Sequence, residues 1–475
     1  MGEAVQELNE HMHCNTREEG AENLRLVIGG TNSSVGKTSI TLAIEAAALK
    51  RGLKVQSFKV GPDYIDPSYH TVTTCRKCRN LDAWMVPERR IVDIIAHAEE
   101  GTDISIIEGV MGMYDGIKGC DDRGSTARIS KLAKSPCILV VDAHSMARSA
   151  GAVVLGFASY DRRVNLAGVI LNRVGSASHE QWCRDAISRT GIPVVGAVPT
   201  LEERLEERHL GLVPTPELRP DLERMTSKIA PHLDVDKLLE IATLAKPLPA
   251  GSLFRAKKGG NAKEKVRIGL AFDEAFNFYY WDALEILENR GAEIVQFSPI
   301  HDSTLPEVDG LYIGGGFPEV QPSELERNLG MRQSIKKAAE DGMPLLAECG
   351  GLMYLTRSIT DFNGKRSSMV GFLEADTIMT RKLVLNYTQA DVERENILSA
   401  KGTSLKGHEF HYSGLTSIAG DAKFAYKMRI GKGIDDGREG WISNNVLASY
   451  MHLHLASNLK LPDRLVASCK GYAKR

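Results

Sequence analysis

The chain has 475 residues, a formal net charge of -2 and 25% charged residues. At roughly 100 to 200 residues per domain, this length predicts two or three domains. Neither sign of charge forms a long block, so the sequence gives no reason to expect nucleic acid or an anionic membrane as a partner.

The first 23 residues are polar and acidic, and we expect residues 1–23 to form a disordered extension. They contain no apolar signal core, and no later segment offers about 18 uninterrupted apolar residues. The eight cysteines are scattered over a long chain, which argues against a secreted disulfide framework. We therefore expect a cytoplasmic protein in a reducing compartment.

Short apolar runs alternate with helical stretches in the first half of the chain. These runs are brief and rich in Val and Ile, and they read LRLVIGG, DISIIEG, CILVVDA, LAGVILN and IPVVGAVP. Runs of this kind are typical of buried parallel strands. The pattern predicts an α/β domain with a parallel sheet over residues 24–244.

The stretch VIGGTNSSVGKTS follows the first of these strands and leads into a helical period that begins after Gly36. A glycine-rich loop between a strand and a helix N-terminus directs backbone N–H groups at an anion, and phosphate is the expected guest. Lys37 would reach the β and γ phosphates and the Thr38 hydroxyl would bind Mg²⁺. The usual pattern has glycine five residues before Gly-Lys-Thr, whereas here Thr31 occupies that position and Gly30 precedes it. We expect the ATP-binding residues to be Gly30, Thr31, Gly36, Lys37, Thr38 and Ser39. A turn with a chance lysine is the alternative, and the ordered strand, loop, Lys-Thr pair and helix argue against it.

Acidic side chains follow the next two apolar segments. FKVGPDYIDP contains Lys59, Asp63 and Asp66, and ISIIEGVMGMYDG contains Glu108 and Asp115. The carboxyl ends of parallel strands line the crevice where ligands bind, and carboxylates there can hold Mg²⁺. Glu108 is the firmest metal candidate because it ends a strand, while Asp63 and Asp66 lie beside prolines and fit turn residues equally well.

Asn172 also ends a predicted strand, in VILNRV. Its side chain would either contact an adenine edge or cap the following segment, and the spacing does not distinguish these roles.

A second α/β domain is predicted over residues 266–475. It follows a linker over residues 245–265 that is rich in Pro, Gly, Ala and Lys. Strand-like runs resume as VRIGLAF, AEIVQFSP, GLYIGGGF and MPLLAEC.

The run PLLAECGGLMYL indicates a tight strand-to-helix elbow that presents Cys349 at a helix N-terminus. That setting predicts a lowered thiol pKa and a nucleophilic thiolate. The N–H groups of Gly315, Gly316 and Gly350 could then form an oxyanion hole. A small buried cysteine beside packing glycines is the alternative, and the upstream YIGGGFPE argues against it.

A base for this thiol has several candidates. ASYMHLHLASN contains His452 and His454, which alternation on a strand would place on one face. The residues alone do not choose between these two. His408 and His411 in GHEFHYS are further candidates, although histidine-rich surface segments are usually structural or contact the substrate.

The ordered motifs resemble one family. GTNSSVGKT, FKVGPDYIDP, RNLDAWM, IEGVMGMYDG, RHLGLVPTPE, GGGFPE, AECGGLMYL, GHEFHYS and YMHLH look, in this order, like the cobyrinic acid a,c-diamide synthases and the related nickel-sirohydrochlorin a,c-diamide synthases. The match runs from about residue 24 to the end. The resemblance implies a P-loop domain similar to dethiobiotin synthetase, followed by a class I glutamine amidotransferase-like domain.

The resemblance also implies roles for residues that match the motifs. Cys349 would be the glutaminase nucleophile and His452 the base that activates it. ATP would phosphorylate a tetrapyrrole carboxylate, and ammonia from glutamine would convert the acyl phosphate to an amide on the a and c acetates. Carboxylate or phosphoryl handling would involve Lys59, Asp63, Asp66 and Asp115, and Mg²⁺ would be bound by Thr38, Asp63 and Glu108.

Some questions stay open at this stage. The substrate would be cobyrinate, with nickel-sirohydrochlorin and hydrogenobyrinate as alternatives, and a homodimer is common for the related ATPase domain. His454 stands where many related amidotransferases have Glu, so the third member of the triad is in doubt. We interpret Cys75 and Cys78 as chance surface cysteines, since a lone C-x-x-C is weak evidence for zinc. A nucleotide-switch ATPase with a non-catalytic C-terminal domain is the alternative from another functional class.

Overall fold

The computed structural model describes residues 24–201, 219–249, 251–254 and 265–474. The predicted extension over residues 1–23, the RHLGLVPTPE motif and most of the predicted linker lie outside the described residues. Contacts divide the chain into two compact units. The first unit extends to Ser252 and the second runs from Leu253 to the end, except that Trp84–Pro87 groups with the second unit.

The first unit is built on a parallel sheet with the order β3-β2-β4-β1-β5-β6-β7. Its strands are β1 Leu24–Gly30, β2 Val55–Val60, β3 Arg79–Leu81, β4 Ile104–Glu108, β5 Cys137–Asp142, β6 Leu166–Val174 and β7 Val194–Pro199. The five apolar runs therefore form strands as predicted. Because β1 lies near the middle of the sheet, the loop that follows it opens at the carboxyl edge between β4 and β5.

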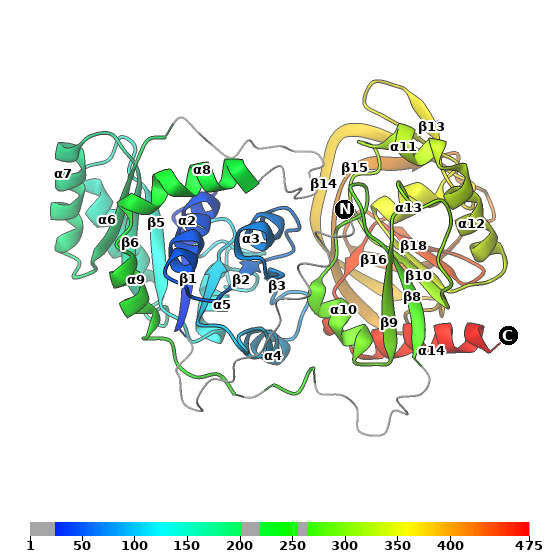
Figure 1. Ribbon diagram of the computed structural model, residues 1–475, viewed down its shortest axis with the longest axis horizontal. Helices are drawn as coiled ribbons and strands as arrows, with labels where there is room; N and C mark the ends of the chain where they lie inside the picture. Colours follow the sequence, from blue (N-terminus) through cyan, green and yellow to red (C-terminus); the bar gives the residue numbers. More distant parts are fainter. Residues whose placement is uncertain (1–23, 202–218, 250, 255–264, 475) are drawn as a thin grey trace. The chain divides into compact units, whose positions relative to one another are not determined.

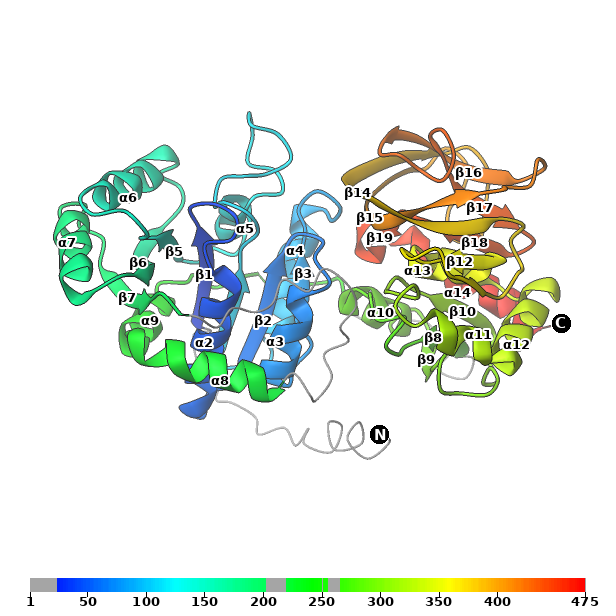
Figure 2. The same ribbon diagram turned by 90° about the horizontal axis from the view of Figure 1, so that it is seen from above.

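Helices cover both faces of this sheet (Figures 1 and 2). They are α2 Lys37–Lys50, α3 Asp66–Thr74, α4 Glu88–Ala98, α5 Thr126–Leu132, α6 Ser149–Tyr160, α7 Ala177–Ser188, α8 Arg219–Ile229, η2 Ala230–His232 and α9 Val235–Ala242. Side chains of α2, α8 and α9 share one hydrophobic cluster with the central strands. This packing fixes the N-terminus of α2 against the sheet edge.

A buried ion pair joins the first strand to the end of α4. Arg25 Nε lies 2.5 Å from Glu99 Oε1, and both side chains are 2% exposed. The Arg25 guanidinium also donates to Glu99 Oε2 at 2.7 Å and to the Ala133 carbonyl at 2.6 Å. Such a pair is weak evidence for added stability, but the loss of either partner would leave a buried charge.

The second unit combines a parallel half with an antiparallel half. Strands β9, β8, β10, β11 and β18 pair in that order and are parallel, and β17, β16 and β14 continue the sheet in antiparallel fashion. The strands are β8 Val266–Ala271, β9 Ala292–Phe297, β10 Gly310–Ile313, β11 Leu345–Glu348, β12 Ser358–Thr360, β13 Arg366–Ser368, β14 Asp376–Val392, β15 Ser404–Thr416, β16 Lys423–Ile430, β17 Arg438–Ser443, β18 Val446–Ser449 and β19 His452–Leu453.

The parallel half carries the strands that the sequence predicted, and the helices of this unit complete it (Figure 2). These are α10 Trp281–Glu288, α11 Pro322–Arg327, α12 Leu329–Glu340, α13 Gly350–Leu355, η3 Leu455–Ser457 and α14 Lys460–Ala473. The α/β class and the P-loop sheet are as predicted. Among the helices of the described ranges, none is both long and apolar enough to cross a membrane.

Candidate functional site

The predicted phosphate loop joins β1 to α2. Gly36 caps the helix with φ 92°, a left-handed conformation that favours glycine. A Cβ atom at Gly36 would lie 2.3 Å from Asn172 Nδ2, so the position has no room for a side chain. The first backbone N–H groups of α2 have no partner within the helix and open at the sheet edge. The loop therefore has the geometry of an anion site.

The Lys37 ammonium lies among carbonyl groups of the site. Its Nζ atom donates to the Met111 carbonyl at 2.5 Å and to the Asn32 carbonyl at 3.2 Å. Burial and the neighbouring Lys59 lower the pKa of Lys37 to about 8. The lysine therefore connects the loop to the segment that follows β4, where phosphate oxygens would compete with the two carbonyls.

Thr38, Asp66 and Glu108 converge in front of this loop. The Thr38 hydroxyl donates to Glu108 Oε1 at 2.7 Å and lies 3.3 Å from Asp66 Oδ2. The Lys59 ammonium donates to Glu108 Oε1 at 2.7 Å and forms an ion pair with Asp66. Burial opposes the charge of Lys59, but Asp66 and Glu108 raise its pKa above the usual value. The prediction that these residues meet at one sheet edge is therefore consistent with the geometry.

These oxygens fit a magnesium ion. A hydroxyl and two carboxylates are hard oxygen ligands of the type that Mg²⁺ selects. The arrangement favours Asp66 over Asp63, because Asp63 Oδ1 accepts the backbone N–H of Ile65 at 2.8 Å in a local turn. Among the described residues, no three His, Cys, Asp or Glu side chains are grouped to hold a metal ion alone. Oxygen atoms from phosphate or water would have to complete the shell.

Two further predicted residues have local partners. Asp115 Oδ2 accepts the backbone N–H of Gly112 at 3.0 Å and so shapes the segment after β4. Asn172 donates from Nδ2 to the Val35 carbonyl at 2.8 Å, and its Oδ1 accepts the backbone N–H of Arg173 at 2.9 Å. Both the nitrogen and the oxygen of the Asn172 amide are therefore hydrogen-bonded to backbone groups, and the bond to Val35 holds the phosphate loop in place.

A buried chain of charged side chains, not predicted from the sequence, lies behind Glu108. His70 Nε2 lies 2.6 Å from Glu108 Oε2, and His70 Nδ1 lies 2.9 Å from Glu45 Oε1. Burial opposes the charge on His70, but Glu45 and Glu108 raise its pKa to about 10. The spacing in the sequence could have indicated that Glu45 is buried near the site, because it lies about two helical turns after Lys37 on the buried face of α2.

The two cysteines of the C-x-x-C pair belong to no group of three or more metal-binding side chains among the described residues. Cys75 is exposed and Cys78 is buried, and neither forms a disulfide with another described cysteine. The interpretation of both as surface cysteines was therefore wrong for Cys78, which is 0% exposed.

In the second unit, Cys349 forms the predicted elbow between β11 and α13. Its φ is 48°, a left-handed value that is strained for a residue with a side chain. Its backbone N–H donates to the Ser449 carbonyl at 2.7 Å, so β18 holds the elbow in place. Strain at a residue between strand and helix exposes a nucleophile in hydrolases that use such an elbow.

The predicted lowering of the Cys349 pKa was wrong. Burial and the charge of Glu319 raise the pKa of this thiol well above its usual range, although the Gly350 backbone N–H opposes the rise. The side chain is 4% exposed, and α13 has only six residues, Gly350–Leu355. A short helix offers little dipole, so desolvation dominates.

The glycines expected to bind an oxyanion lie close to the elbow. A Cβ at Gly350 would lie 3.1 Å from the Gly316 nitrogen, so these two backbone groups are adjacent. Gly316 has φ 154°, and a Cβ there would lie 2.1 Å from the Ala275 carbonyl oxygen. Gly315 lies against His452, whose Cε1 would be 2.5 Å from an added Cβ. The geometry thus brings the three glycines and His452 together.

The four candidate histidines are buried. His408 stacks on His452 with ring centroids 4.8 Å apart, and its Nε2 lies 2.7 Å from the Tyr280 hydroxyl. His411 lines a small cavity with Cys349, and its Nδ1 donates to the Ser413 carbonyl at 2.9 Å. His454 accepts the Ala456 N–H at 3.1 Å through Nδ1. Burial lowers the pKa of all four imidazoles, which are therefore neutral near pH 7.

Two buried carboxyl groups support this region and were not predicted. Glu348 Oε1 accepts the Leu453 N–H at 3.0 Å, and its Oε2 accepts the Tyr312 hydroxyl at 2.7 Å. Glu439 Oε1 accepts the Tyr450 N–H at 3.1 Å. Both carboxyl groups hold the backbone next to His452. The sequence alone did not identify the third member of the triad that His452 would form with Cys349.

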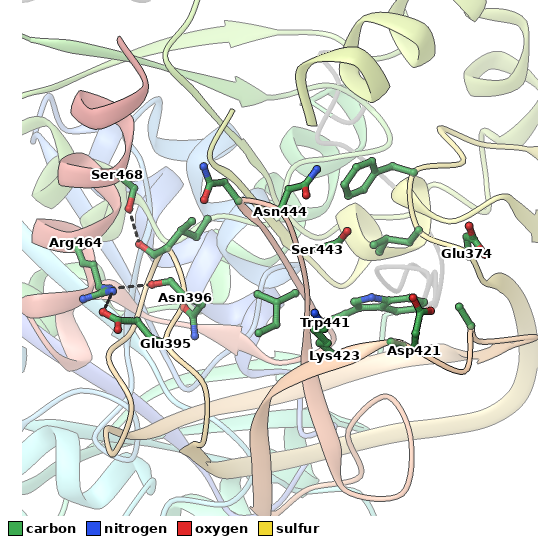
Figure 3. Close-up of a pocket in the computed structure, with 17 residues that line it drawn as sticks. Glu374, Glu395, Asn396, Asp421, Lys423, Trp441, Ser443, Asn444, Arg464 and Ser468 are labelled. Carbon is green, nitrogen blue, oxygen red and sulfur yellow. Dashed lines mark hydrogen bonds and ion pairs between the residues drawn. The ribbon is translucent and has the colours of Figure 1, made fainter. Parts of the chain in front are cut away.

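A larger cavity of about 650 Å³ lies elsewhere in the second unit (Figure 3). Asn445 lines this cavity and directly precedes β18, and its carbonyl accepts the N–H of Leu345, the first residue of β11. The cavity therefore lies at the N-terminal ends of β11 and β18, whereas Cys349 follows the C-terminal end of β11. Arg464 of this cavity is paired with Glu395 and donates to the Asn396 carbonyl at 2.8 Å.

Comparison with known proteins follows the same division. Residues 26–213 match the family described as CobQ/CobB/MinD/ParA nucleotide binding domain, and residues 267–460 match the CobB/CobQ-like glutamine amidotransferase domain. A protein of Methanosarcina acetivorans named cobyrinate a,c-diamide synthase is 46% identical over 93% of this chain and 94% of its own length. The chain belongs to the cobyrinate a,c-diamide synthase family.

Other relatives with this name give similar values. A protein of Methanosarcina barkeri is 45% identical over 96% of this chain and 98% of its own length. A protein of Dehalococcoides mccartyi is 45% identical over 94% of this chain and 98% of its own length. The chain is therefore an enzyme, an ATP-dependent carbon–nitrogen ligase that takes its nitrogen from glutamine.

Two solved structures match at low scores. PurLQS from Thermotoga maritima gives a TM-score of 0.35 at 19% identity, covering 44% of this chain and 100% of its own. A crystal structure of a glutamine amidotransferase gives a TM-score of 0.31 at 17% identity, covering 43% of this chain and 98% of its own. Scores this low support no conclusion about this chain.

Proposed function

We propose that the chain converts cobyrinate to cobyrinate a,c-diamide by amidating the a and c acetate carboxylates, with ATP and glutamine as co-substrates. The observation that carries the proposal is the family match. Relatives named for this reaction are 41–46% identical and align with 91–96% of the chain. The two clusters around Lys37 and Cys349 would supply the two chemistries that such a reaction requires.

The cluster around Cys349 suits the release of ammonia from glutamine. His452 would take the thiol proton, and the sulfur would attack the side-chain amide carbon to form a tetrahedral oxyanion. The N–H groups of Gly315, Gly316 and Gly350 would stabilise that charge. Collapse breaks the carbon–nitrogen bond, the proton goes to the departing ammonia, and water then hydrolyses the thioester to glutamate.

The cluster around Lys37 suits carboxylate activation. A carboxylate oxygen of the macrocycle would attack the γ-phosphorus of ATP, which forms an acyl phosphate and releases ADP. Ammonia would then attack the acyl carbon and displace phosphate. Lys37 would stabilise charge on the phosphoryl oxygens, and Lys59 would hold Asp66 and Glu108 in place.

Magnesium would be held by Thr38, Asp66 and Glu108. Bound there, it would neutralise phosphate charge and orient the phosphoryl group. Asp63 and Asp115 would then act through the shape of their loops, since both accept backbone N–H groups.

Product mass spectrometry tests the proposal. Purified protein would be incubated with ATP, Mg²⁺ and glutamine labelled in its amide nitrogen, with cobyrinate, hydrogenobyrinate and nickel-sirohydrochlorin in separate reactions. We expect two labelled amides on cobyrinate. Exclusive amidation of another macrocycle would replace the substrate and keep the reaction.

Cysteine variants control the nitrogen source. Cys349→Ala should stop transfer from glutamine and keep amidation from ammonium salts, whereas Cys183→Ala, at another buried thiol, should keep both. ATP hydrolysis with no amidation of any macrocycle would contradict the proposal and favour a nucleotide switch.

A further inference from the structure

A small cavity beside Cys349 is lined by a carboxylate that has one buried oxygen without a hydrogen-bond partner among the described residues. The cavity has a volume of about 20 Å³, and its walls include Cys349, Glu319, Phe278, Phe317 and Phe410. Glu319 Oε2 is buried and has no hydrogen-bond partner among the described residues. The pocket is therefore apolar apart from a thiol, an imidazole, hydroxyl groups and this single acid.

Glu319 is positioned by the same segment that carries the oxyanion glycines. It follows Gly316 by three residues, and the intervening Phe317 donates its N–H to the Ala275 carbonyl at 2.9 Å. This hydrogen bond holds the backbone between the glycines and the acid. Glu319 and Cys349 line the same cavity.

The other buried acids of this region differ from Glu319. Glu348 and Glu439 both accept backbone N–H groups from distant segments, and so they stabilise the fold. In the larger cavity, the guanidinium of Arg464 is paired with Glu395 (Figure 3). Among the described residues, Glu319 accepts no N–H from a distant segment and forms no ion pair, and burial raises its pKa to about 7. A buried acid without a partner costs free energy, which a ligand with a cationic donor would recover.

Glutamine has one cationic group, and it is at the end of the molecule away from the side-chain amide. The thiol that attacks the amide and the acid that would pair with a cation both line the cavity, which at about 20 Å³ would have to widen to admit glutamine. We propose that the Glu319 carboxylate binds the α-ammonium group of glutamine while Cys349 attacks the side-chain amide. This inference rests on the proposed glutaminase half-reaction and assigns the residue that selects its substrate.

The pairing would also prepare the thiol. The negative charge of Glu319 disfavours the Cys349 thiolate in the empty pocket. An ammonium group bound to Glu319 cancels that charge, and the thiol then loses its proton more easily. Glutamine would therefore promote the nucleophile that consumes it.

The test compares glutamine with 4-carbamoylbutanoate, which has the same amide and carboxylate but no α-ammonium group. Glutaminase kcat/KM would be measured for the full-length wild type, Glu319→Gln and the control Glu324→Gln, which changes a partly exposed acid of α11. We expect Glu319→Gln to lower kcat/KM for glutamine by roughly 10- to 100-fold, the value of a charged buried hydrogen bond, and to leave the analogue unchanged. The control should leave both values unchanged.

Other outcomes separate the possible failures. Equal losses for both substrates would indicate a structural role and overturn the proposal, as would no loss for either. Ammonia-dependent amidation by Glu319→Gln checks folding, and calorimetric titration of glutamine into Cys349→Ala, with and without Glu319→Gln, measures binding without turnover. A wild type that neither binds nor hydrolyses glutamine would instead overturn the proposed function.

Discussion

The two chemical centres of this chain handle buried charge in opposite ways. Around the phosphate loop, buried ions are paired: Lys59 contacts Asp66 and Glu108, and His70 lies between two carboxylates. Around Cys349, burial removes charge, because the pKa values of the imidazoles fall and those of the thiol and Glu348 rise. The first centre is organised for an ionic ligand before it arrives, while the thiol and the imidazoles of the second are uncharged until a substrate binds.

The largest expected effect is on the neutral centre. His452→Ala should lower glutaminase kcat by roughly 100- to 10,000-fold, because the thiol would lose its general base. Ammonia-dependent amidation should persist. The competing base is His411, whose Nε2 is unpaired among the described side chains. We expect His411→Ala to have a much smaller effect, and the reverse ranking would reassign the base.

The next effect is on the ionic centre. Lys37→Met should reduce ATP-dependent amidation by about 100- to 1000-fold, since it removes a positive charge from the developing phosphoryl charge. Glutaminase activity measured without ATP should be unchanged. The matched control is Lys50→Met at the exposed end of the same helix. Equal losses in both variants would show that the helix itself has been disturbed.

Because the buried ions of the first unit are paired, the loss of one partner should lower the stability of the fold. Glu99→Ala leaves the Arg25 guanidinium buried without its carboxylate, and should lower the free energy of unfolding by about 3–5 kcal/mol. Urea titration measures this. Asp236→Ala removes the partner of exposed Arg51 and should cost less than about 1 kcal/mol. Similar costs for the two variants would contradict the idea that burial sets the value of a pair.

The last effect, which is small over any one pH unit, is a slope of stability with pH. Burial raises the pKa of Glu439 to about 8, so the folded state holds a proton that the unfolded chain releases near its usual, lower pKa. The resulting stability is complete below the unfolded pKa and is lost as the pH rises toward 8. Unfolding free energy should fall by up to about 1.4 kcal/mol per pH unit in that interval. Glu439→Gln should reduce the slope of the unfolding free energy with pH. An unchanged slope would show that other titrating groups cause it.

The sequence predicted the parallel strands and the phosphate loop because their signals are local. Apolar runs marked β1 and β11, and the rule for sheet edges brought Thr38 and Glu108 together. The antiparallel half escaped prediction, since the pairing of β14 with β15 depends on register between distant segments and includes a bulge between Met379 and Val384.

Within the sites, the failures concern burial. Cys349 was assigned a low pKa from its place before a helix, but the sequence does not state how much water reaches a thiol. Glu45 and His70 were missed because their importance lies in a contact across 25 positions of the chain. Residue type predicts which chemistry is available, whereas burial decides which form is present.

The buried elbow also bears on oxidative damage. Oxidation of a thiol to sulfenic acid proceeds through the thiolate and requires access. Cys349 is 4% exposed and burial raises its pKa, which disfavours the thiolate, whereas Cys75 and Cys120 are exposed on the first unit. An oxidant would therefore modify those two surface thiols first, and the nucleophile would survive mild peroxide stress between turnovers.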